Sequence, residues 1–507
     1  MVQTKIKTLG ELKASGYKPK SIKEEIRNNL IQKLQRKENT FSGIVGYEDS
    51  VIPDVERALL SKHNILFLGL RGQAKTRMAR QMIELLDEYI PFVSGSDIND
   101  DPLRPVSKFA KDFIVEKGDA TPIEWLHRSQ RYGEKLATPD VSVADLIGDI
   151  DPIKAANLKL SFADERVIHY GIIPRSNRGI FVINELPDLQ ARIQVALFNI
   201  LEEGDVQIRG FKLRLPLDIL FVFTANPEDY TNRGSIVTPL KDRIESQILT
   251  HYPKSLENAL EITEQEADID EAQKQKVKIS DLVKRLIEQV AFEARGSEFV
   301  DKKSGVSARL TISAFENAIS SAERRAIVNN EKDTQVWIND LIGIIPSITG
   351  KIELVYEGEQ EGPYQVAMNL LEKAIRSQFV QYFPNPEALK KRVKTKQEAD
   401  RGDNPYRSIT SWFDKGNNLN IFFNTSDKDK VLLLYKVDGL SALVKKYFPK
   451  ANEMEAALLM EFVLHGLSSH SLISKKILET KVEFKDLIGS MMNLGNKNYE
   501  EEFDEEG

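Results

Sequence analysis

A single octapeptide restricts the fold of this chain more than any other feature of its sequence. Residues 69–76 read Gly-Leu-Arg-Gly-Gln-Ala-Lys-Thr and lie between the apolar run Ile65–Leu68 and a helical pattern over Arg77–Leu86. A glycine-containing turn between a buried strand and a helix directs backbone N–H groups at an anion, and the lysine and threonine that end it suit phosphate and Mg²⁺. The predicted phosphate-binding residues are Gly69, Arg71, Gly72, Gln73, Ala74, Lys75 and Thr76.

Position 74 departs from the common form of such a loop. The pattern is GxxxxGK[ST], and Ala74 stands where its second glycine is expected. Alanine fits this position if its backbone angles are ordinary, although it narrows the conformations that the loop tolerates. The sequence therefore predicts nucleotide binding but leaves the rate of hydrolysis open.

Two other apolar runs end in polar side chains, as strands buried on both faces do at a ligand-binding edge. Ile180–Ile183 is followed by Asn184 and Glu185, and Ile219–Phe223 leads to Asn226. A carboxylate beside the phosphate strand can orient an attacking water, so we predict that Glu185 is catalytic. Asn184 replaces an acid that would help to hold Mg²⁺ together with Thr76. Its amide oxygen can reach the ion through water but adds no charge.

Asn226 and two arginines complete the predicted site. An amide at a strand tip beside the phosphate strand is suited to position water against the γ-phosphate, although a turn before proline explains Asn226 equally well. Arg243 follows a proline-initiated helix and suits either a neighbouring subunit's γ-phosphate or a surface ion pair. Arg309 opens a later helix, where it suits either the nucleotide or a surface position.

In their order along the chain, these segments resemble the AAA+ ATPases of the magnesium-chelatase I-subunit and MoxR group. The resemblance covers about residues 40–345 and includes Gly43–Glu48, which is similar to the segment that lies against the adenine, and Pro174–Gly179 before the Glu185 strand. It implies an α/β fold, namely an AAA+ P-loop domain with a parallel sheet and β-hairpin insertions, followed by a helical lid and a mixed α+β C-terminal extension.

The resemblance also implies roles for individual residues and segments. It places Val45, Gly46 and Tyr47 at the nucleotide, with Asn226 as the first sensor, Arg243 as the arginine finger and Arg309 as the second sensor. It identifies Ala155–Gly171 and Asp205–Pro216 as β-hairpin insertions. The implied cofactors are ATP and Mg²⁺, and the implied assembly is a homo-hexameric ring. The implied partner is a protein with a von Willebrand factor A domain.

Periodicity and composition predict four segments. They are an N-terminal helical arm at 1–40, a nucleotide-binding α/β domain at 41–254, a helical lid at 255–345 and an extension with an acidic tail at 346–507. Ser21–Glu24 forms a capping-box pattern at the start of a helix in the arm, and this helix is expected to pack on the next domain. In the extension, Leu419–Phe423 and Val431–Val437 are predicted strands, and Lys391–Tyr406 is a predicted linker.

Composition excludes several classes of function. The chain has no cysteine, which excludes disulfides, thiolate zinc sites and cysteine-ligated iron–sulfur clusters. Its formal net charge of −7 argues against a nucleic-acid partner. Its longest apolar runs are strand-sized, so no membrane span is expected. The N-terminus lacks the apolar core of a signal peptide, and we expect a cytoplasmic protein.

Three functions remain open on the sequence. The first is a ring ATPase that remodels or activates a partner protein, of which a true chelatase subunit would be a special case. The second is an ATP-gated scaffold with little hydrolysis, which Asn184 motivates. The third is a transcription activator of the enhancer-binding type. It is disfavoured because the chain shows neither a GAFTGA loop nor a helix-turn-helix, and its C-terminus is acidic.

Overall fold

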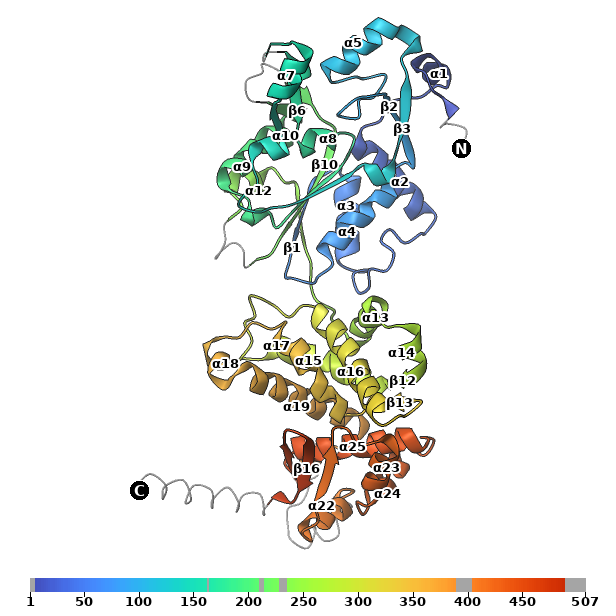
Figure 1. The fold of residues 1–507 in the computed structure, drawn as a ribbon, viewed down its shortest axis with the longest axis vertical. Coiled ribbons are helices and arrows are strands. Elements are labelled where there is room, and N and C mark those ends of the chain that lie inside the picture. Colours follow the sequence, from blue (N-terminus) through green and yellow to red (C-terminus); the bar gives the residue numbers. More distant parts are fainter. Residues whose placement is uncertain (1–4, 162–163, 209–213, 228–234, 389–403, 488–507) are drawn as a thin grey trace, which may run out of the picture. The chain divides into compact units, whose positions relative to one another are not determined.

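A computed structural model describes residues 5–161, 164–208, 214–227, 235–388 and 404–487 (Figure 1). Contacts divide the chain into two compact units, residues 1–252 and 253–507. The finer division into an arm, a nucleotide-binding domain, a lid and an extension remains a proposal. Among the helices of the described ranges, none combines the length and the apolar character needed to cross a membrane.

The first unit alternates helices and strands. Its α-helices are α1 Leu9–Ala14, α2 Ile22–Gln35, α3 Val51–Leu60, α4 Lys75–Gln81, α5 Lys108–Lys117, α6 Val143–Leu146, α7 Pro152–Leu158, α8 Ile172–Arg175, α9 Ala191–Ala196, α10 Phe198–Glu202 and α12 Thr238–Asp242. Its strands are β1 Ile65–Leu68, β2 Tyr89–Val93, β3 Ile123–His127, β4 Tyr132–Leu136, β5 Gly148–Ile150, β6 Ile168–Tyr170, β7 Gly179–Asn184, β8 Asp205–Gln207, β9 Arg214–Pro216, β10 Ile219–Ala225 and β11 Ser246–Leu249.

A five-stranded parallel sheet in the order β11-β1-β10-β7-β4 forms the centre of this unit. Strands β1, β7 and β10 confirm the three predicted apolar runs, and each is buried on both faces. Alternate residues enter different cores. Phe67 packs with α2, α3 and α4, whereas Phe181 and Phe223 pack with α8, α9, α10 and α12. Figure 1 shows α3 and α4 on one side of the sheet and α9 and α12 on the other.

The predicted N-terminal helix belongs to the same core. The Ser21 side chain accepts from the backbone N–H of Glu24 and the Glu24 side chain accepts from that of Ser21, so the predicted capping box is confirmed at the start of α2. Ile26 on α2 is buried beside the sheet. Glu25 on the same helix forms a buried bidentate ion pair with Arg131, with distances of 2.6 and 2.7 Å. Helix α2 is therefore fastened to the sheet unit by both apolar and charged contacts.

One predicted hairpin is confirmed and the other is wrong in part. Strands β8 and β9 pair antiparallel within Asp205–Pro216, as predicted. The segment Ala155–Gly171 is not a hairpin by itself, because its first residues belong to helix α7 and β6 is the one strand among its described residues. The antiparallel partner of β6 is β5, which lies before the predicted segment. Asp151 caps α7 by accepting from two backbone N–H groups, which explains the helix.

The second unit is largely helical. Its α-helices are α13 Leu256–Glu266, α14 Glu271–Lys276, α15 Asp281–Gly296, α16 Arg309–Val328, α17 Ile345–Thr349, α18 Tyr356–Glu361, α19 Pro363–Tyr382, α22 Arg407–Asp414, α23 Asp427–Tyr435, α24 Leu440–Tyr447 and α25 Glu453–Ser469. Its strands are β12 Val277–Lys278, β13 Thr334–Gln335, β14 Leu419–Phe422, β15 Ser474–Ile477 and β16 Lys481–Lys485. Strands β14, β16 and β15 form an antiparallel sheet in that order.

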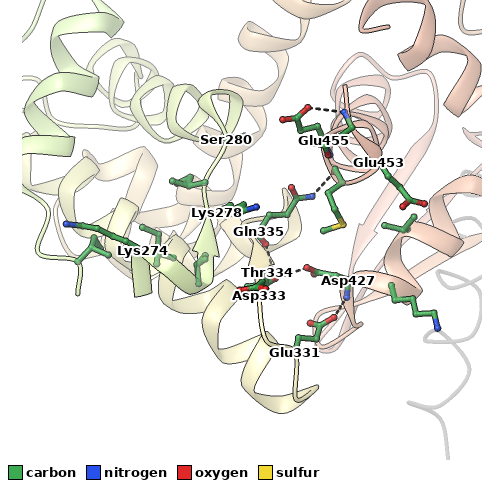
Figure 2. A pocket seen from close by; sticks show the side chains of 18 of the residues that line it. Lys274, Lys278, Ser280, Glu331, Asp333, Thr334, Gln335, Asp427, Glu453 and Glu455 are labelled. Carbon is green, nitrogen blue, oxygen red and sulfur yellow. Dashed lines mark hydrogen bonds between the residues drawn. The ribbon is translucent and has the colours of Figure 1, made fainter. Parts of the chain in front are cut away.

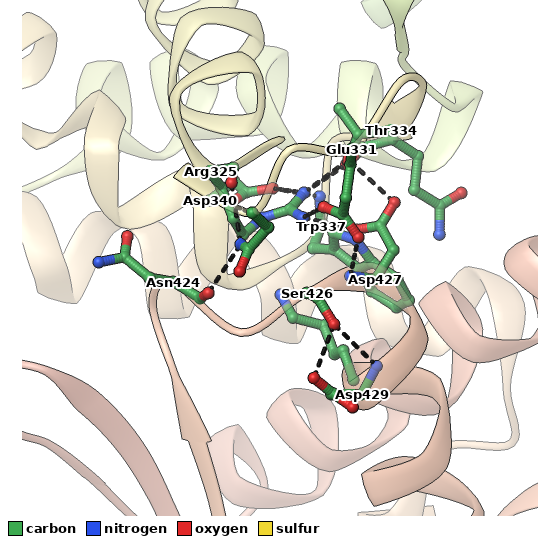
Figure 3. A network of polar contacts seen from close by, with 12 residues as sticks. Arg325, Glu331, Thr334, Trp337, Asp340, Asn424, Ser426, Asp427 and Asp429 are labelled. Atoms are coloured by element: carbon green, nitrogen blue, oxygen red, sulfur yellow. Dashed lines mark hydrogen bonds and ion pairs between the residues drawn. The ribbon is translucent and has the colours of Figure 1, made fainter. Parts of the chain in front are cut away.

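One hydrophobic core runs through this unit from Val277 to Phe484. A buried polar network joins the segment before residue 345 to the segment after it (Figure 3). Arg325 on α16 forms ion pairs with Asp340 and with Asp427 on α23. The indole Nε1 of Trp337 also donates to Asp427, at 2.8 Å. The predicted lid and the predicted extension thus share their interior.

The predicted strand Val431–Val437 is wrong, because its residues up to Tyr435 lie in helix α23. Val431 and Leu434 are buried while Leu432 is 55% exposed, a spacing that fits one face of a helix. The predicted strand Leu419–Phe423 is confirmed as β14. Most of the predicted linker Lys391–Tyr406 and the whole acidic tail lie outside the described residues.

Candidate nucleotide site

The predicted phosphate loop lies at the carboxyl end of β1 and leads into α4, which begins at Lys75. Gly72 has a φ of +72°, which glycine adopts readily. A Cβ atom on Gly69 would lie 2.0 Å from Oγ1 of Thr250, so this position requires glycine for close approach. The two glycines therefore have distinct roles, one in the turn and one in packing.

Ala74 adopts a left-handed conformation, with a φ of 57° and a ψ of 13°. The condition of ordinary backbone angles under which alanine fits this position is therefore not met. The left-handed region costs an L-residue about 1–2 kcal/mol, because its Cβ approaches the backbone carbonyl. The loop keeps the conformation that favours glycine and bears this cost at the alanine.

Lys75, Asn226 and Glu185 lie in one hydrogen-bonded network at the carboxyl ends of β1, β10 and β7. Nζ of Lys75 donates to Oδ1 of Asn226 at 2.8 Å and to the carbonyl oxygens of Gly69 and Leu70. Nδ2 of Asn226 donates to Oε2 of Glu185 at 2.7 Å. The structure thus brings together three residues that are predicted to serve phosphate binding, water positioning and proton transfer.

Thr76 and Asn184 face one another beside this network. Oδ1 of Asn184 accepts from Oγ1 of Thr76 at 3.3 Å and from Oγ1 of Thr224 at 3.1 Å. Hydroxyl and amide oxygens are ligands, direct or through water, that suit Mg²⁺. The donor set therefore fits the predicted cation, with the amide in place of an acid.

Glu134, on β4, contacts Asn184 of this pair, although the sequence did not identify it. Its Oε1 accepts from Nδ2 of Asn184 at 2.7 Å, and Arg80 on α4 donates to both carboxylate oxygens, at 2.9 and 3.0 Å. Burial raises the pKa of Glu134, but the hydrogen bonds from Arg80 and Tyr132 outweigh burial and hold it below its usual value. The group is therefore a carboxylate at neutral pH.

Tyr47 contacts the backbone of the predicted phosphate loop at Gln73. Its ring is buried, and its hydroxyl oxygen lies 3.0 Å from the carbonyl oxygen of Gln73 and 2.7 Å from that of His251. Burial raises the pKa of Tyr47 to about 12. Val45 and Gly46, which precede it, are half-buried. The contact of Tyr47 with the loop is made through its hydroxyl group.

Three further residues that sequence analysis missed hold the loop. Thr250 donates to Oε1 of Gln73 at 2.7 Å, the His251 carbonyl contacts Tyr47, and the Tyr252 hydroxyl donates to the carbonyl of Arg71 at 2.9 Å. They follow β11, which pairs with β1. Their signal in the sequence was a polar triplet after a short strand, which is informative only once the pairing is known.

The described contacts of Arg243 do not include this network. Arg243 directly follows α12, pairs with Glu202, donates to the carbonyl of Pro239 at 2.8 Å and lies over the Phe198 ring. Its side chain is 28% exposed. Arg309 begins α16 in the second unit.

A groove of about 1340 Å³ lies in the second unit (Figure 2). Its lining includes Phe315, Ile319 and Met454 as well as the charged residues Lys278 and Glu453. None of the predicted nucleotide residues lines it. Among the described residues, no group of three or more acidic or histidine side chains is arranged to hold a metal ion.

The parallel sheet, the predicted phosphate loop at the end of β1 and the polar ends of β7 and β10 form an α/β unit consistent with the AAA+ fold. The chain is homologous to the 38 kDa subunit of magnesium chelatase. It is 25% identical over 229 residues to that subunit from Cereibacter sphaeroides, which covers 44% of this chain and 61% of the relative. It is also 25% identical over 228 residues to the subunit from Rhodobacter capsulatus, which covers 44% of this chain and 59% of the relative.

The chain thus spans about three fifths of the length of these curated relatives. No family model matches it. Solved structures that align with it include a putative ATPase from Cytophaga hutchinsonii, with 19% identity, a TM-score of 0.29 and coverage of 72% of this chain and 98% of that chain. A complex of the BchI and BchD subunits of magnesium chelatase aligns with 19% identity, a TM-score of 0.32 and coverage of 63% and 98%. Similarity at this level defines no function.

Proposed function

We propose that this chain is a Mg²⁺–ATP-dependent ATPase of a ring assembly that remodels or activates a partner protein. The observation that carries the proposal is the network of Lys75, Asn226 and Glu185. It joins a cation at the phosphate loop, a fixed amide and a carboxylate within hydrogen-bonding distance of one another. Nucleotide hydrolysis needs these three elements, namely charge stabilisation, orientation and a base for water.

The first step assigned to these residues is an exchange of partners at Lys75. Its ammonium group is bonded to two loop carbonyls and to Asn226, and the lysine is buried. The β- and γ-phosphate oxygens of ATP would replace carbonyl partners, because an ammonium group binds a charged oxygen more strongly than a neutral carbonyl oxygen. Thr76, and Asn184 through water, would hold Mg²⁺, which supplies charge neutralisation at the phosphates when it is bound.

Glu185 then accepts a proton from the attacking water. Asn226 donates to one carboxylate oxygen, and the other oxygen belongs to the same rigidly held group. The Glu185 backbone N–H also donates to Thr224 at 3.1 Å, which fixes the residue at the end of β7 in its left-handed conformation. The Glu185 carboxylate is thus oriented by two contacts, the backbone bond to Thr224 and the side-chain bond from Asn226, as a general base requires.

Arg243 is proposed to act on the nucleotide of a neighbouring subunit. Its guanidinium is partly exposed and its partner Glu202 is 53% exposed, so exchange of that ion pair for a phosphate costs little. This assignment requires a ring, and we propose a homo-hexamer. We further propose that the partner protein carries a von Willebrand factor A domain, as the resemblance to the chelatase and MoxR group implies. Arg309 is proposed as the second sensor.

Steady-state ATP turnover of the assembled chain tests the proposal. We expect turnover that Glu185→Gln lowers by about 100- to 1,000-fold while nucleotide binding persists, because the glutamine still accepts from Asn226 but is a poor base. Arg243→Ala should lower turnover only in the assembly. Arg57→Ala is the matched control, since Arg57 is an exposed ion-pair arginine of the same unit. Equal turnover of Arg243→Ala and the parent in the assembly would reject the action of Arg243 between subunits.

A second candidate function is an ATP-gated scaffold that binds ATP and scarcely hydrolyses it. Asn184 favours this function because the residue facing Thr76 brings no charge. Nucleotide binding without turnover, together with a Glu185→Gln variant that behaves like the parent, would support the scaffold. Turnover that depends on Glu185 would exclude it.

A further inference from the structure

Strand β7 ends in an amide at the candidate cation site, and a carboxylate from the neighbouring strand contacts that amide. Strands β4 and β7 pair in parallel, with Leu136 opposite Asn184, so Glu134 lies two residues before the end of the shared ladder. Its side chain is 22% exposed and is bound by Arg80 of helix α4. The sheet thus brings an acid to the amide from a segment 50 residues earlier in the chain.

Glu134 determines which end of the Asn184 amide faces Thr76. A primary amide has one oxygen that accepts and one nitrogen that donates, whereas a carboxylate only accepts. The amide nitrogen must therefore face Glu134, and the oxygen is left to accept from Thr76 and Thr224. Without the acid, either end of the amide could face the two hydroxyl groups, because hydroxyls donate and accept.

The position of Glu134 is itself fixed by the helix that follows the predicted phosphate loop. Arg80 lies on α4, the helix that begins at Lys75, and its two nitrogens bind both oxygens of Glu134. The Tyr132 hydroxyl donates to the same carboxylate at 3.0 Å. A planar, bidentate pair of this kind fixes geometry as well as charge. Helix α4 therefore carries Thr76 on one side of the contact and the arginine that orients Glu134 on the other.

We propose that Glu134 is a positioning residue for the cation site, and that through Asn184 it supplies the carboxylate that β7 lacks. The inference rests on the proposed function, since it concerns Mg²⁺ bound with the nucleotide. Glu134 orients the amide oxygen toward Thr76 and places a negative charge one hydrogen bond behind it. Partners at this distance from a metal orient its ligands and raise their basicity.

Two variants test this proposal: Glu134→Gln, which removes the carboxylate, and a double variant that moves the carboxylate to position 184. Affinity for a fluorescent ATP analogue is measured over a Mg²⁺ titration and in EDTA, and the readout is the Mg²⁺ concentration that gives half of the gain in affinity. We expect Glu134→Gln to raise this Mg²⁺ concentration by about 10- to 100-fold, which is the usual effect of removing a group that hydrogen-bonds to a metal ligand. Affinity for the nucleotide in EDTA should be unchanged. Glu124→Gln, on an exposed position of β3, is the matched control.

The double variant Glu134→Gln/Asn184→Asp restores the pair with its charge moved to the neighbouring strand. The amide introduced at position 134 can donate to the new carboxylate at position 184, which still accepts from Thr76 and Thr224. We therefore expect the Mg²⁺ requirement of the double variant to return to within a few-fold of the parent, since an acid now faces Thr76 directly. A double variant as impaired as Glu134→Gln would overturn the proposal, and so would a single variant with the parent's Mg²⁺ requirement.

Thermal unfolding of each variant is measured first, and binding is assayed below the lowest midpoint. If Glu134→Gln is unfolded at every usable temperature, the double variant alone decides. Parent-like Mg²⁺ dependence then supports the proposal and impaired dependence rejects it. A parent chain that binds no nucleotide at any Mg²⁺ concentration would reject the proposed function, and this inference with it. Nucleotide binding with an unaffected Mg²⁺ requirement would reject the inference alone.

Discussion

Nδ2 of Asn226 donates to Oε2 of Glu185 at 2.7 Å, and Oδ1 of the same amide accepts from Lys75 at 2.8 Å. One side chain thus fixes the proposed base and the proposed phosphate-binding lysine relative to each other. Because β10 lies between β1 and β7 in the sheet, a residue at its tip can reach both neighbours. The strand order therefore accounts for the contact.

We expect Asn226→Ala to reduce ATP turnover by about 100-fold at saturating ATP, because displacement of a catalytic group by roughly 1 Å costs that much. Nucleotide affinity should change little, since the variant keeps the phosphate loop and the Lys75 ammonium group that is proposed to bind the phosphates. Turnover and binding of a fluorescent analogue are measured in parallel. A variant that loses affinity as strongly as turnover would show that Asn226 serves the ground state instead.

Ala74→Gly should stabilise the first unit. The left-handed alanine costs about 1–2 kcal/mol, and the extra freedom of glycine in the unfolded chain offsets about 0.5–1 kcal/mol of the gain. We therefore expect the free energy of unfolding in urea to rise by about 0.5–1 kcal/mol. Ala79→Gly, within helix α4, is the control and should have the opposite sign. A destabilised Ala74→Gly variant would contradict the left-handed conformation at this position.

Loss of Glu25 should destabilise the first unit strongly. Its ion pair with Arg131 is almost completely buried, so Glu25→Gln leaves a buried guanidinium without its counter-charge, at a cost of about 3–5 kcal/mol. Asp119→Asn breaks the exposed pair with Lys13 and should cost less than about 1 kcal/mol. Urea unfolding measures both. Equal effects of the two substitutions would mean that Glu25 is solvated.

The stability of the second unit should decrease from mildly acidic to neutral pH through Glu288. Burial raises the pKa of this carboxyl to about 7, partly offset by hydrogen bonds from Thr263 and Thr311 and by Arg295. Its folded pKa exceeds its unfolded value, so its contribution is complete below about pH 4.5 and is lost as the pH rises through 7. The loss amounts to at most about 3 kcal/mol.

Glu288→Gln should remove this dependence and raise the free energy of unfolding above pH 7. Unfolding in urea is measured between pH 5 and 8 for the parent and the variant. Glu261→Gln, at an exposed position of α13, is the control and should retain the parent's pH profile. A Glu288→Gln variant that keeps that profile would assign the dependence to another group.

The strands buried on both faces were predictable from the sequence, whereas the half-buried strand β4 at the edge of the sheet was not. Ile180–Ile183 and Ile219–Phe223 are continuous apolar runs, and their polar ends located Asn184, Glu185 and Asn226. Strand β4 reads Tyr-Gly-Glu-Lys-Leu and is only half-buried, so no apolar run marked it. Glu134 was missed for that reason, since its contact depends on strand pairing across 50 residues.

The local sequence pattern also led to a wrong prediction at Val431–Val437, where an apolar run suits either a strand or a helix. The run beginning at Val431 is apolar enough for a strand, but Ser426 caps a helix there and Leu432 is exposed. Short apolar runs do not distinguish helix from strand by themselves. The left-handed conformation of Ala74 was not predicted either, because an alanine gives no sign of a positive φ even where the pattern expects glycine.

The single core of the second unit has a consequence for how such a chain can change over time. Helix α15 packs along α19, Gln378 donates to Gln289 at 2.8 Å, and Asp427 neutralises Arg325 from the far side of residue 345. A C-terminal extension that had been added to the predicted lid as an independent domain would have its own hydrophobic core. Here the two segments share one interior. We therefore expect them to be passed on together in evolution, and a substitution in one segment to be retained only where it suits the packing of the other.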